Sequence, residues 1–536
     1  MLSLSPLIQL TPTGSLEIVR KAVHDLSKFR VPARATLLTL LLAFIYLFAR
    51  SRFFAPISWD EEQFLWEGWL VKSGSVPYRD FFEQKPPLIF FANALGVGVF
   101  GLDGFLFRIV PSIVAVVSIV LFYTAMIRRQ VAHWLAALLT AQVALWLLGP
   151  EFHDTGLNDS ETYGFAFTLL GFSLGLLTAS VRGDRSRALF QILSGICFGL
   201  AVCSKELFLF SAIPAWFLAA RRREAPGWDP KQLLFSAVGI ILVGLTVLVY
   251  LATNSALAPY LEVLRFNRAI AGSLCVDIGE FPRVSAFPAL LESWSRLHNK
   301  LYSFGHLAFV MGLWAALPLL APRNKKGRSN AIDIGMAMAG IVLGMIAVSV
   351  GHCFFRHYFL MGITGLVLLS VIGAEGVSDF LSEPRGHTSK VAFAGFSALF
   401  VLVAAVPTKA MLAKKQTRYY FPWNSTVRET IDRHSGPGDY ILASDSPLIY
   451  AVMNRKNPLP LGAFTDQLLP YLVNSPTLRV DSLRERLEKH PPKVCFFAGA
   501  LRHRQEQFYQ LLIDPFLSEH HYVKVNDQLW YLPDAK

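Results

Sequence analysis

Charged residues are scarce in this sequence of 536 residues. They make up 16% of the chain, whereas 53% of it is hydrophobic. Ordinary soluble domains carry about 25% charged residues, so a water-soluble protein of this composition would have too little polar surface to cover its apolar residues. The scarcity of charge excludes a compact soluble enzyme, a fibre and a disordered scaffold. It predicts a membrane protein that crosses the bilayer many times.

Cysteines and glycine-rich phosphate loops are also lacking. The five cysteines are an odd number and form no CxxC pair, so the sequence encodes neither a disulfide framework nor a zinc site. It has no Rossmann fingerprint and no Walker A motif, which excludes a soluble nucleotide-sugar or ATP site of those kinds. We find no internal repeat, and this disfavours a transporter built from inverted repeats.

Apolar runs of the length that a spanning helix needs, about 20 residues, recur along the chain. We count about eleven, near 36–53, 105–127, 132–149, 162–181, 188–204, 207–220, 233–253, 306–321, 331–350, 358–373 and 391–407. The fifth and sixth runs are short and meet at Lys205-Glu206, so one long helix is the alternative for this pair.

The net charge is +12, and the basic residues that produce it are distributed unevenly between the two faces of the membrane. The basic loops all fall on one face, together with the N-terminal segment, at 128–129, 182–187, 221–223, 323–328 and 385–390. Cytoplasmic loops carry such an excess, so it does not indicate nucleic acid.

We therefore expect a cytoplasmic arm at 1–35, a transmembrane domain at 36–407, and long outer loops at 54–104 and 254–305. Because the number of helices is odd, the tail at 408–536 lies on the outer face. Its pattern predicts a small α/β domain. We expect strands within 438–443 and at 493–497, helices over 447–454 and 502–514, and a terminal hairpin or strand at 521–532.

Acidic residues gather at the start of the first outer loop. Asp60, Glu61 and Glu62 begin a segment whose bulky apolar residues predict a helix on the membrane surface. The acids lie at its N-terminus, where the helix dipole favours them. Taken alone, this pattern is equally typical of an ordinary capped interfacial helix. The loop continues with Tyr78 and with Lys85-Pro86-Pro87-Leu88, and it ends at Phe100-Gly101, Arg108 and Pro111-Ser112.

These motifs resemble the first outer loop of the superfamily of protein O-mannosyltransferases and lipid A aminoarabinose transferases, which are membrane glycosyltransferases of the GT-C fold. Three later segments are also similar to the family. They are the acidic loop with Asp154, Asp159 and Glu161, the Gly-Leu-Ala segment that ends at Lys205, and the segment Arg356-His357-Tyr358. The resemblance implies a polytopic GT-C fold of about 11 helices, with amphipathic helices on its outer face and a small C-terminal α/β domain.

The resemblance also implies an activity, which is transfer of a sugar from a polyprenyl-phosphate donor to a hydroxyl acceptor. Asp60 matches the catalytic base of the family, and Glu61 would orient the acceptor or help to hold the site. A phosphate leaving group needs cations, for which Lys85, Lys205, Arg356 and His357 are suited. Tyr78, Arg108 and Tyr358 would be structural or would lie near the substrate. Asp154, Asp159 and Glu161 would bind the acceptor or complete a site for Mg²⁺ or Mn²⁺; we commit to no cofactor.

The expected location is a bacterial inner membrane, with the site and the tail facing the periplasm. The acceptor is a glycolipid such as lipid A, a glycan or a protein, and the other partners are membrane lipids. Two departures narrow the resemblance: Gln63 stands where aminoarabinose transferases commonly have an Arg, and the Trp-Trp-Asp motif of oligosaccharyltransferases is absent. The alternatives are a transporter or flippase for a lipid-linked saccharide and a non-catalytic relative.

Overall fold

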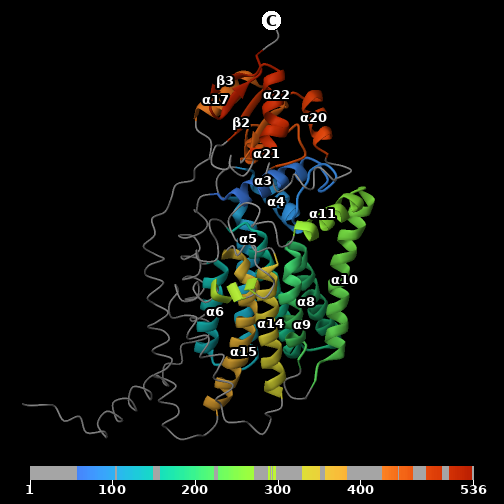
Figure 1. Cartoon of the computed structure of the whole chain (residues 1–536). Coiled ribbons are helices and arrows are strands. Elements are labelled where there is room, and N and C mark those ends of the chain that lie inside the picture. The colour runs from blue at the N-terminus through green and yellow to red at the C-terminus, as the bar shows by residue number, and fades with distance from the viewer. Residues whose placement is uncertain are drawn as a thin grey trace, which may run out of the picture.

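The computed structural model describes most of a helical body and one small sheet. The described residues are 57–102, 106–148, 157–221, 227–270, a few positions between 288 and 296, 329–350, 356–382, 425–444, 446–462, 479–497 and 506–533. In Figure 1 the C-terminal sheet lies at one end of the long helices, and α3 (Trp59–Lys72) and α4 (Leu88–Phe100) lie between the sheet and those helices.

Within the described ranges, six helices are long and apolar enough to cross a membrane. They are Leu106–Arg128, Ser160–Ser180, Asp184–Ser204, Pro230–Thr253, Ala331–Ser349 and His357–Gly376. Shorter apolar helices cover Leu88–Phe100, Leu135–Leu148 and Glu206–Ala219. The prediction of a polytopic helical membrane protein with a C-terminal α/β region is confirmed.

Eight of the predicted apolar runs coincide with helices. These are α5 (Ile109–Arg128), α6 (His133–Leu148), α7 (Ser160–Leu177), α8 (Asp184–Ser204), α9 (Leu209–Ala219), α10 (Pro230–Thr253), α14 (Ser329–Ser349) and α15 (Leu360–Ser382). The predicted runs at 36–53, 306–321 and 391–407 lie outside the described residues. A break at Lys205 separates α8 from α9, so these are two helices rather than one.

The helices differ in what covers their apolar side chains. Helices α7 and α15 are largely buried among their neighbours, whereas α10 leaves most of its apolar surface exposed. Exposed Leu234, Ile241 and Leu245 lie on α10, as expected for a helix that faces lipid. Helix α10 packs closely on α8, because Gly195 faces the Ser236 backbone with no room for a Cβ atom. Such small residues allow close approach of helices in membranes.

The described basic loop residues, Arg128-Arg129 and Arg221, lie at the end of the helices away from the sheet. Helix α5 begins at the sheet end and finishes at Arg128, and α9 runs in the same direction toward Arg221. Ion pairs join this far end, with Arg129 Nε 2.6 Å from Glu375 Oε1 and Arg221 Nε 2.8 Å from Asp333 Oδ1. The one-sided distribution of charge predicted from the loops therefore holds for these described residues.

The C-terminal sheet has four strands in the order β1-β2-β4-β3. Strands β1 (Ile441–Ser444) and β2 (Val494–Phe497) are parallel, and β4 (Leu529–Tyr531) is antiparallel to both β2 and β3 (Val523–Asn526). The accompanying helices are α17 (Ser425–His434), α18 (Leu448–Val452), α20 (Val480–Lys489), α21 (Glu506–Phe508), the π-helix η8 (Tyr509–Ile513) and α22 (Asp514–Glu519). The strands agree with the sequence prediction; α17 and α20 were not predicted.

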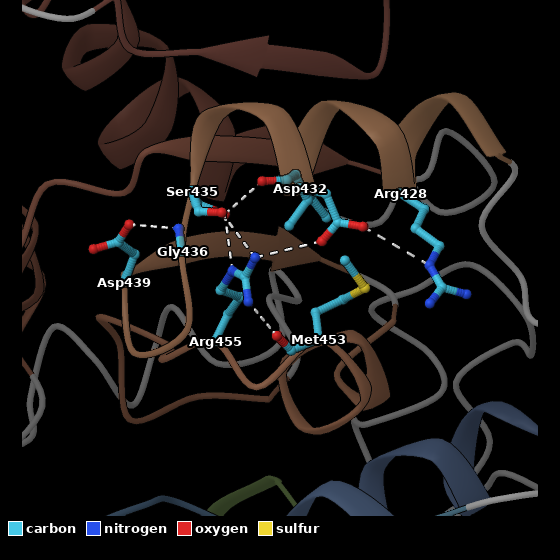
Figure 2. A network of polar contacts seen from close by, with 8 residues as sticks. Arg428, Asp432, Ser435, Gly436, Asp439, Met453 and Arg455 are labelled. Atoms are coloured by element: carbon cyan, nitrogen blue, oxygen red, sulfur yellow. Dashed lines mark hydrogen bonds and ion pairs between the residues drawn. The ribbon is translucent and has the colours of Figure 1, made fainter.

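A buried arginine holds the first helix of this region (Figure 2). Arg455 is 5% exposed. Its guanidinium donates to Ser435 Oγ at 2.9 Å, to the Ser435 carbonyl at 2.8 Å and to the Met453 carbonyl. It also contacts Asp432 at 3.4 Å. These bonds satisfy the Ser435 carbonyl just after α17 and the Met453 carbonyl just after α18. A positive charge at the end of α17 also favours the helix dipole.

Replacing Arg455 with Met should lower the free energy of unfolding by about 2 kcal/mol, because buried carbonyl oxygens would lose their donors. Thermal denaturation of the full chain in detergent measures the effect. Arg428→Met is the matched control, since Arg428 is exposed and lies 4.0 Å from the same Asp432. Equal melting temperatures for the two variants would contradict this role of Arg455.

The sheet region is docked on the first outer loop. Ser446 Oγ donates to Glu62 Oε2 of α3 at 2.8 Å, in a buried position. The Phe82 N–H donates to the Pro460 carbonyl at 2.7 Å. The Trp66 ring lies 5.8 Å from the Tyr450 ring. It also covers Gly462, where a Cβ atom would clash with it.

Candidate functional site

The predicted catalytic acid, Asp60, stands in the first turn of α3. A capping box fixes this turn: the Glu61 N–H donates to Ser58 Oγ at 3.1 Å, and the Ser58 N–H donates to Glu61 Oε2 at 3.2 Å. Asp60 is partly exposed, and its carboxylate has no hydrogen-bond or ion-pair partner among the described residues. It is therefore held in place by the helix and free to contact a substrate.

Glu61, the neighbouring acid, is fully engaged. It has no exposed surface, and Arg108 binds both of its oxygens, with Nε 3.0 Å from Oε1 and a terminal nitrogen 2.5 Å from Oε2. The Asn158 N–H also donates to Oε1, at 3.1 Å. Glu61 therefore joins the start of α3 to the start of α5 and to the segment before α7, which makes it a positioning residue for Asp60.

Replacing Glu61 with Gln should cost about 3 to 5 kcal/mol of stability, because the Arg108 charge would remain buried without its partner. A large fall in melting temperature of the purified protein is the expected result. Glu519→Gln is the control: Glu519 also lies 2.5 Å from an arginine nitrogen, but both partners are about half exposed. Exposed pairs contribute about 0 to 1 kcal/mol. A similar melting temperature for both variants would contradict the structural role of Glu61.

The second acidic segment begins with polar side chains that are satisfied within the protein. Asn158 donates to Asn93 Oδ1 of α4 at 2.6 Å, and it accepts from the Tyr163 hydroxyl at 3.3 Å. Asp159 is the N-cap of α7 and accepts from the Thr162 N–H at 2.8 Å. The structure thus places Asp159 as a helix cap close to the buried Glu61 network.

Glu161 lies at the centre of a cluster of cations. It forms an ion pair with Lys205 and accepts from Ser160 Oγ at 2.9 Å. His357 Nε2 is 3.9 Å from Glu161 Oε1. The Lys205 ammonium lies 3.3 Å from the centre of the Tyr358 ring. The cluster joins α7, the break between α8 and α9, and the short helix η5 (Arg356–Phe359).

Lys85 approaches the same cluster from the first outer loop, and it interacts electrostatically with Glu161 and Asp60. Its side chain is partly exposed and has no hydrogen-bond partner in the described part of the chain. Burial lowers the pKa of the Lys85 ammonium. The electrostatic effect of the groups around it outweighs burial and raises the pKa above its ordinary value; these groups are Tyr358, Glu161, Asp60 and Glu83. Lys85 is therefore a free, charged cation.

The backbone of Lys85 is fixed on both sides. Glu83 Oε1 accepts from the Lys85 N–H at 3.2 Å, and the Tyr78 hydroxyl donates to the Lys85 carbonyl at 2.7 Å. Tyr78 has a φ of 69°, a left-handed conformation that costs free energy for a bulky residue and that is often found at functional sites. The Lys-Pro-Pro turn is thus held rigidly at the position from which Lys85 projects.

Gln63, the departure from the aminoarabinose transferase pattern, has a structural role here. Its amide donates to Glu67 Oε1 at 3.1 Å and to Glu83. Burial raises the pKa of Glu67 well above its ordinary value, and the neighbouring Glu83 carboxylate raises it further. Glu67 therefore holds a proton more readily than an ordinary carboxyl group does. The buried group of Gln63, Glu67 and Glu83 supports the Lys85 turn, and the sequence patterns did not indicate it.

Most of the predicted site residues meet at one place, where the loop before α4 and the ends of α7, α8 and η5 come together. Lys85, Lys205 and His357 all interact with Glu161. Asp60 belongs to the same group through Lys85. Asp154 lies outside the described residues, and so does the side chain of Arg356.

Asp159 and Glu161 are the described candidates for ligands of a divalent cation. In the described ranges, no three His, Cys, Asp or Glu side chains gather in a suitable arrangement. The carboxylates of Asp159 and Glu161 are already bound to Thr162 and Lys205. No step of the reaction below is therefore assigned to a metal ion.

Comparisons with known proteins give matches only among solved structures. No family model and no curated protein matches this chain. The archaeal oligosaccharyltransferase AglB from Archaeoglobus fulgidus, in complex with an inhibitory peptide and a dolichol-phosphate, is 15% identical. Its TM-score is 0.48, over 94% of this chain and 74% of its own. ArnT from Cupriavidus metallidurans, in the apo state, is 13% identical, with a TM-score of 0.43 over 92% of this chain and 97% of its own.

Proposed function

We propose that this protein is a membrane glycosyltransferase. It transfers a sugar from a polyprenyl-phosphate donor to a hydroxyl group of a glycolipid, a glycan or a protein. The observation that carries the proposal is the electrostatic interaction of Asp60 with Lys85. Neither side chain has a hydrogen-bond partner among the described residues, and both belong to the end of the spanning helices next to the C-terminal sheet. A base and a cation are the two groups that this reaction requires.

The reaction follows from the positions of these groups. Asp60 takes the proton from the acceptor hydroxyl, whose oxygen attacks the anomeric carbon of the donor sugar. The bond between that carbon and the phosphate oxygen breaks, and the phosphate leaves with the electron pair. Lys85 stabilises the charge that develops on the phosphate. Lys205 belongs to the same group and is paired with Glu161, and His357 Nε2 lies 3.9 Å from the same carboxylate.

The test is a comparison of envelope glycolipids and glycoproteins by mass spectrometry, in cells that contain the wild-type protein, Asp60→Asn or neither. Wild-type cells should carry an acceptor heavier by one sugar, and the other two should lack it. Identical envelopes in all three would refute the proposal. A transporter would instead move a labelled polyprenyl-phosphate sugar across proteoliposome membranes without transferring it. Parallel assays with EDTA show whether the transfer needs a divalent cation.

The outer face of the membrane is the proposed location of the site. The basic residues at the far end of the helices support this orientation, because such residues mark cytoplasmic ends. Alkaline phosphatase, which is active only outside the cytoplasm, should be active when fused to the C-terminus of the full chain. Green fluorescent protein, a reporter that works in the cytoplasm, should be dark when it is fused to the same C-terminus. The reverse pattern would place the site in the cytoplasm and contradict the proposed orientation.

A further inference from the structure

Glu206 is an acid that the proposed reaction does not use. It follows Lys205 directly, where α8 ends and the short helix η4 (Glu206–Phe208) begins. Its side chain is partly exposed. Its carboxylate interacts with its own backbone N–H, and no side chain among the described residues forms a hydrogen bond or an ion pair with it. Glu161, by contrast, is 2% exposed and bound by Lys205 and Ser160. The cation next to Glu206 in the chain is thus committed to a different acid.

The surroundings of Glu206 are those of the candidate site. The carboxylate interacts electrostatically with Lys205, Lys85 and Glu161. It also interacts with Tyr78 and Tyr260, whose ring centres are 4.9 Å apart. Tyr78 is the residue that holds the Lys85 carbonyl. Glu206 therefore belongs to the same electrostatic group as Lys85, Tyr78 and Tyr260 of α11 (Leu257–Ile270).

A free carboxylate so close to Lys85 restricts what can bind between them. It repels a phosphate, so it cannot be a ligand of the donor phosphate. It accepts hydrogen bonds, and ionised carboxylates have room for several donors. In a polyprenyl-phosphate sugar, the first group beyond the phosphate is the sugar ring with its hydroxyl groups. Bonds from those hydroxyls to a charged acceptor are stronger than bonds between neutral groups.

We propose that Glu206 binds the hydroxyl groups of the transferred sugar and so contributes to the choice of donor. This inference rests on the proposed function. Lys85 then binds the phosphate on one side of the anomeric carbon, and Glu206 holds the sugar ring on the other. Glu206 takes no proton in the reaction; it orients the ring for attack by the acceptor.

The test measures the contribution of the sugar to binding separately from that of the phosphate. The full chain in nanodiscs is titrated with undecaprenyl phosphate and, separately, with undecaprenyl-phosphate glucose, mannose, galactose and aminoarabinose. The wild type should bind at least one sugar-bearing lipid more tightly than undecaprenyl phosphate. Glu206→Gln should weaken the binding of that lipid by roughly tenfold to a hundredfold, the value of a charge-assisted hydrogen bond. It should leave the affinity for undecaprenyl phosphate unchanged.

Lys85→Met is the comparison variant, and it should weaken the binding of both kinds of lipid. Melting temperatures show whether Glu206→Gln is folded, and Glu206→Asp, which keeps the charge, should recover part of the lost affinity. Equal weakening of both lipids by Glu206→Gln, or no weakening of either, would overturn the role of Glu206. If the wild type binds no polyprenyl phosphate at all, the proposed function itself fails, and that result is distinct from the failure of Glu206.

Discussion

Asp60→Asn should transfer sugar at a rate about 10² to 10⁴ times below that of the wild type, the usual effect of losing a general base. Asn has nearly the same size as Asp and cannot accept the proton of the hydroxyl. The carboxylate has no partner among the described residues, so its removal breaks no contact that holds the fold. Expression and melting temperature should therefore stay near the wild-type values. Transfer of radiolabelled sugar from polyprenyl phosphate in proteoliposomes measures the rate.

Glu62→Gln is the matched control for Asp60. Glu62 is two residues further along the same helix and is buried, and its Oε2 accepts from the Ser446 hydroxyl at 2.8 Å. A glutamine retains an oxygen that can accept this bond, so the variant should transfer at a rate much closer to that of the wild type. A normal rate for Asp60→Asn together with an inactive Glu62→Gln would show that the base is assigned to the wrong acid. Full activity of both would contradict the mechanism.

Lys85→Met should weaken donor binding by about a hundredfold, since the phosphate would lose a charged partner in a partly buried position. Methionine preserves the apolar stem of the side chain. The hydrogen bonds that fix this turn use the backbone of Lys85, so they remain in the variant and the loop should keep its conformation. Titration with undecaprenyl phosphate gives the affinity.

Lys72→Met is the control for this prediction. Lys72 is an exposed lysine in the last turn of α3, in the same outer loop, and its loss should leave the affinity unchanged. If both variants bind the lipid equally well, Lys85 does not contact the phosphate. A loss of affinity in both would show instead a general attraction of the loop for anionic lipids.

Sequence patterns indicated the helices and the site to different degrees. Apolar runs are long and regular, so they predicted the eight helices from α5 to α15 that the structure describes in those runs. The motifs around Asp60 and Lys85 are local in sequence, so the sequence alone could indicate them, and the fold brings the two side chains into one electrostatic group. The role of Glu61 could not be predicted in this way, because its partner Arg108 is 47 residues away. Three consecutive acids in a sequence do not show which carboxylate is neutralised by a partner and which is free.

Long-range contacts also explain the other differences. In the sequence, Gln63 stands where aminoarabinose transferases commonly have an arginine. Only the fold brings its side chain to Glu83, 20 residues later. Lys205 was expected to bind the donor phosphate, but the structure pairs it with Glu161 on another helix. Glu206 was not among the predicted site residues, because it belongs to none of the motifs. In each case the decisive fact is which charges lie free after folding, and periodicity carries no information about that.

The contact between Ser446 and Glu62 joins residues 384 positions apart in the chain, and this separation has a consequence for biogenesis. The ribosome makes α3 early, and the segment that contacts it emerges only after the described spanning helices have been synthesised. Trp66 and Glu62 must therefore wait for Tyr450 and Ser446 before α3 reaches its final packing. The last step in the folding of α3 thus comes near the end of translation.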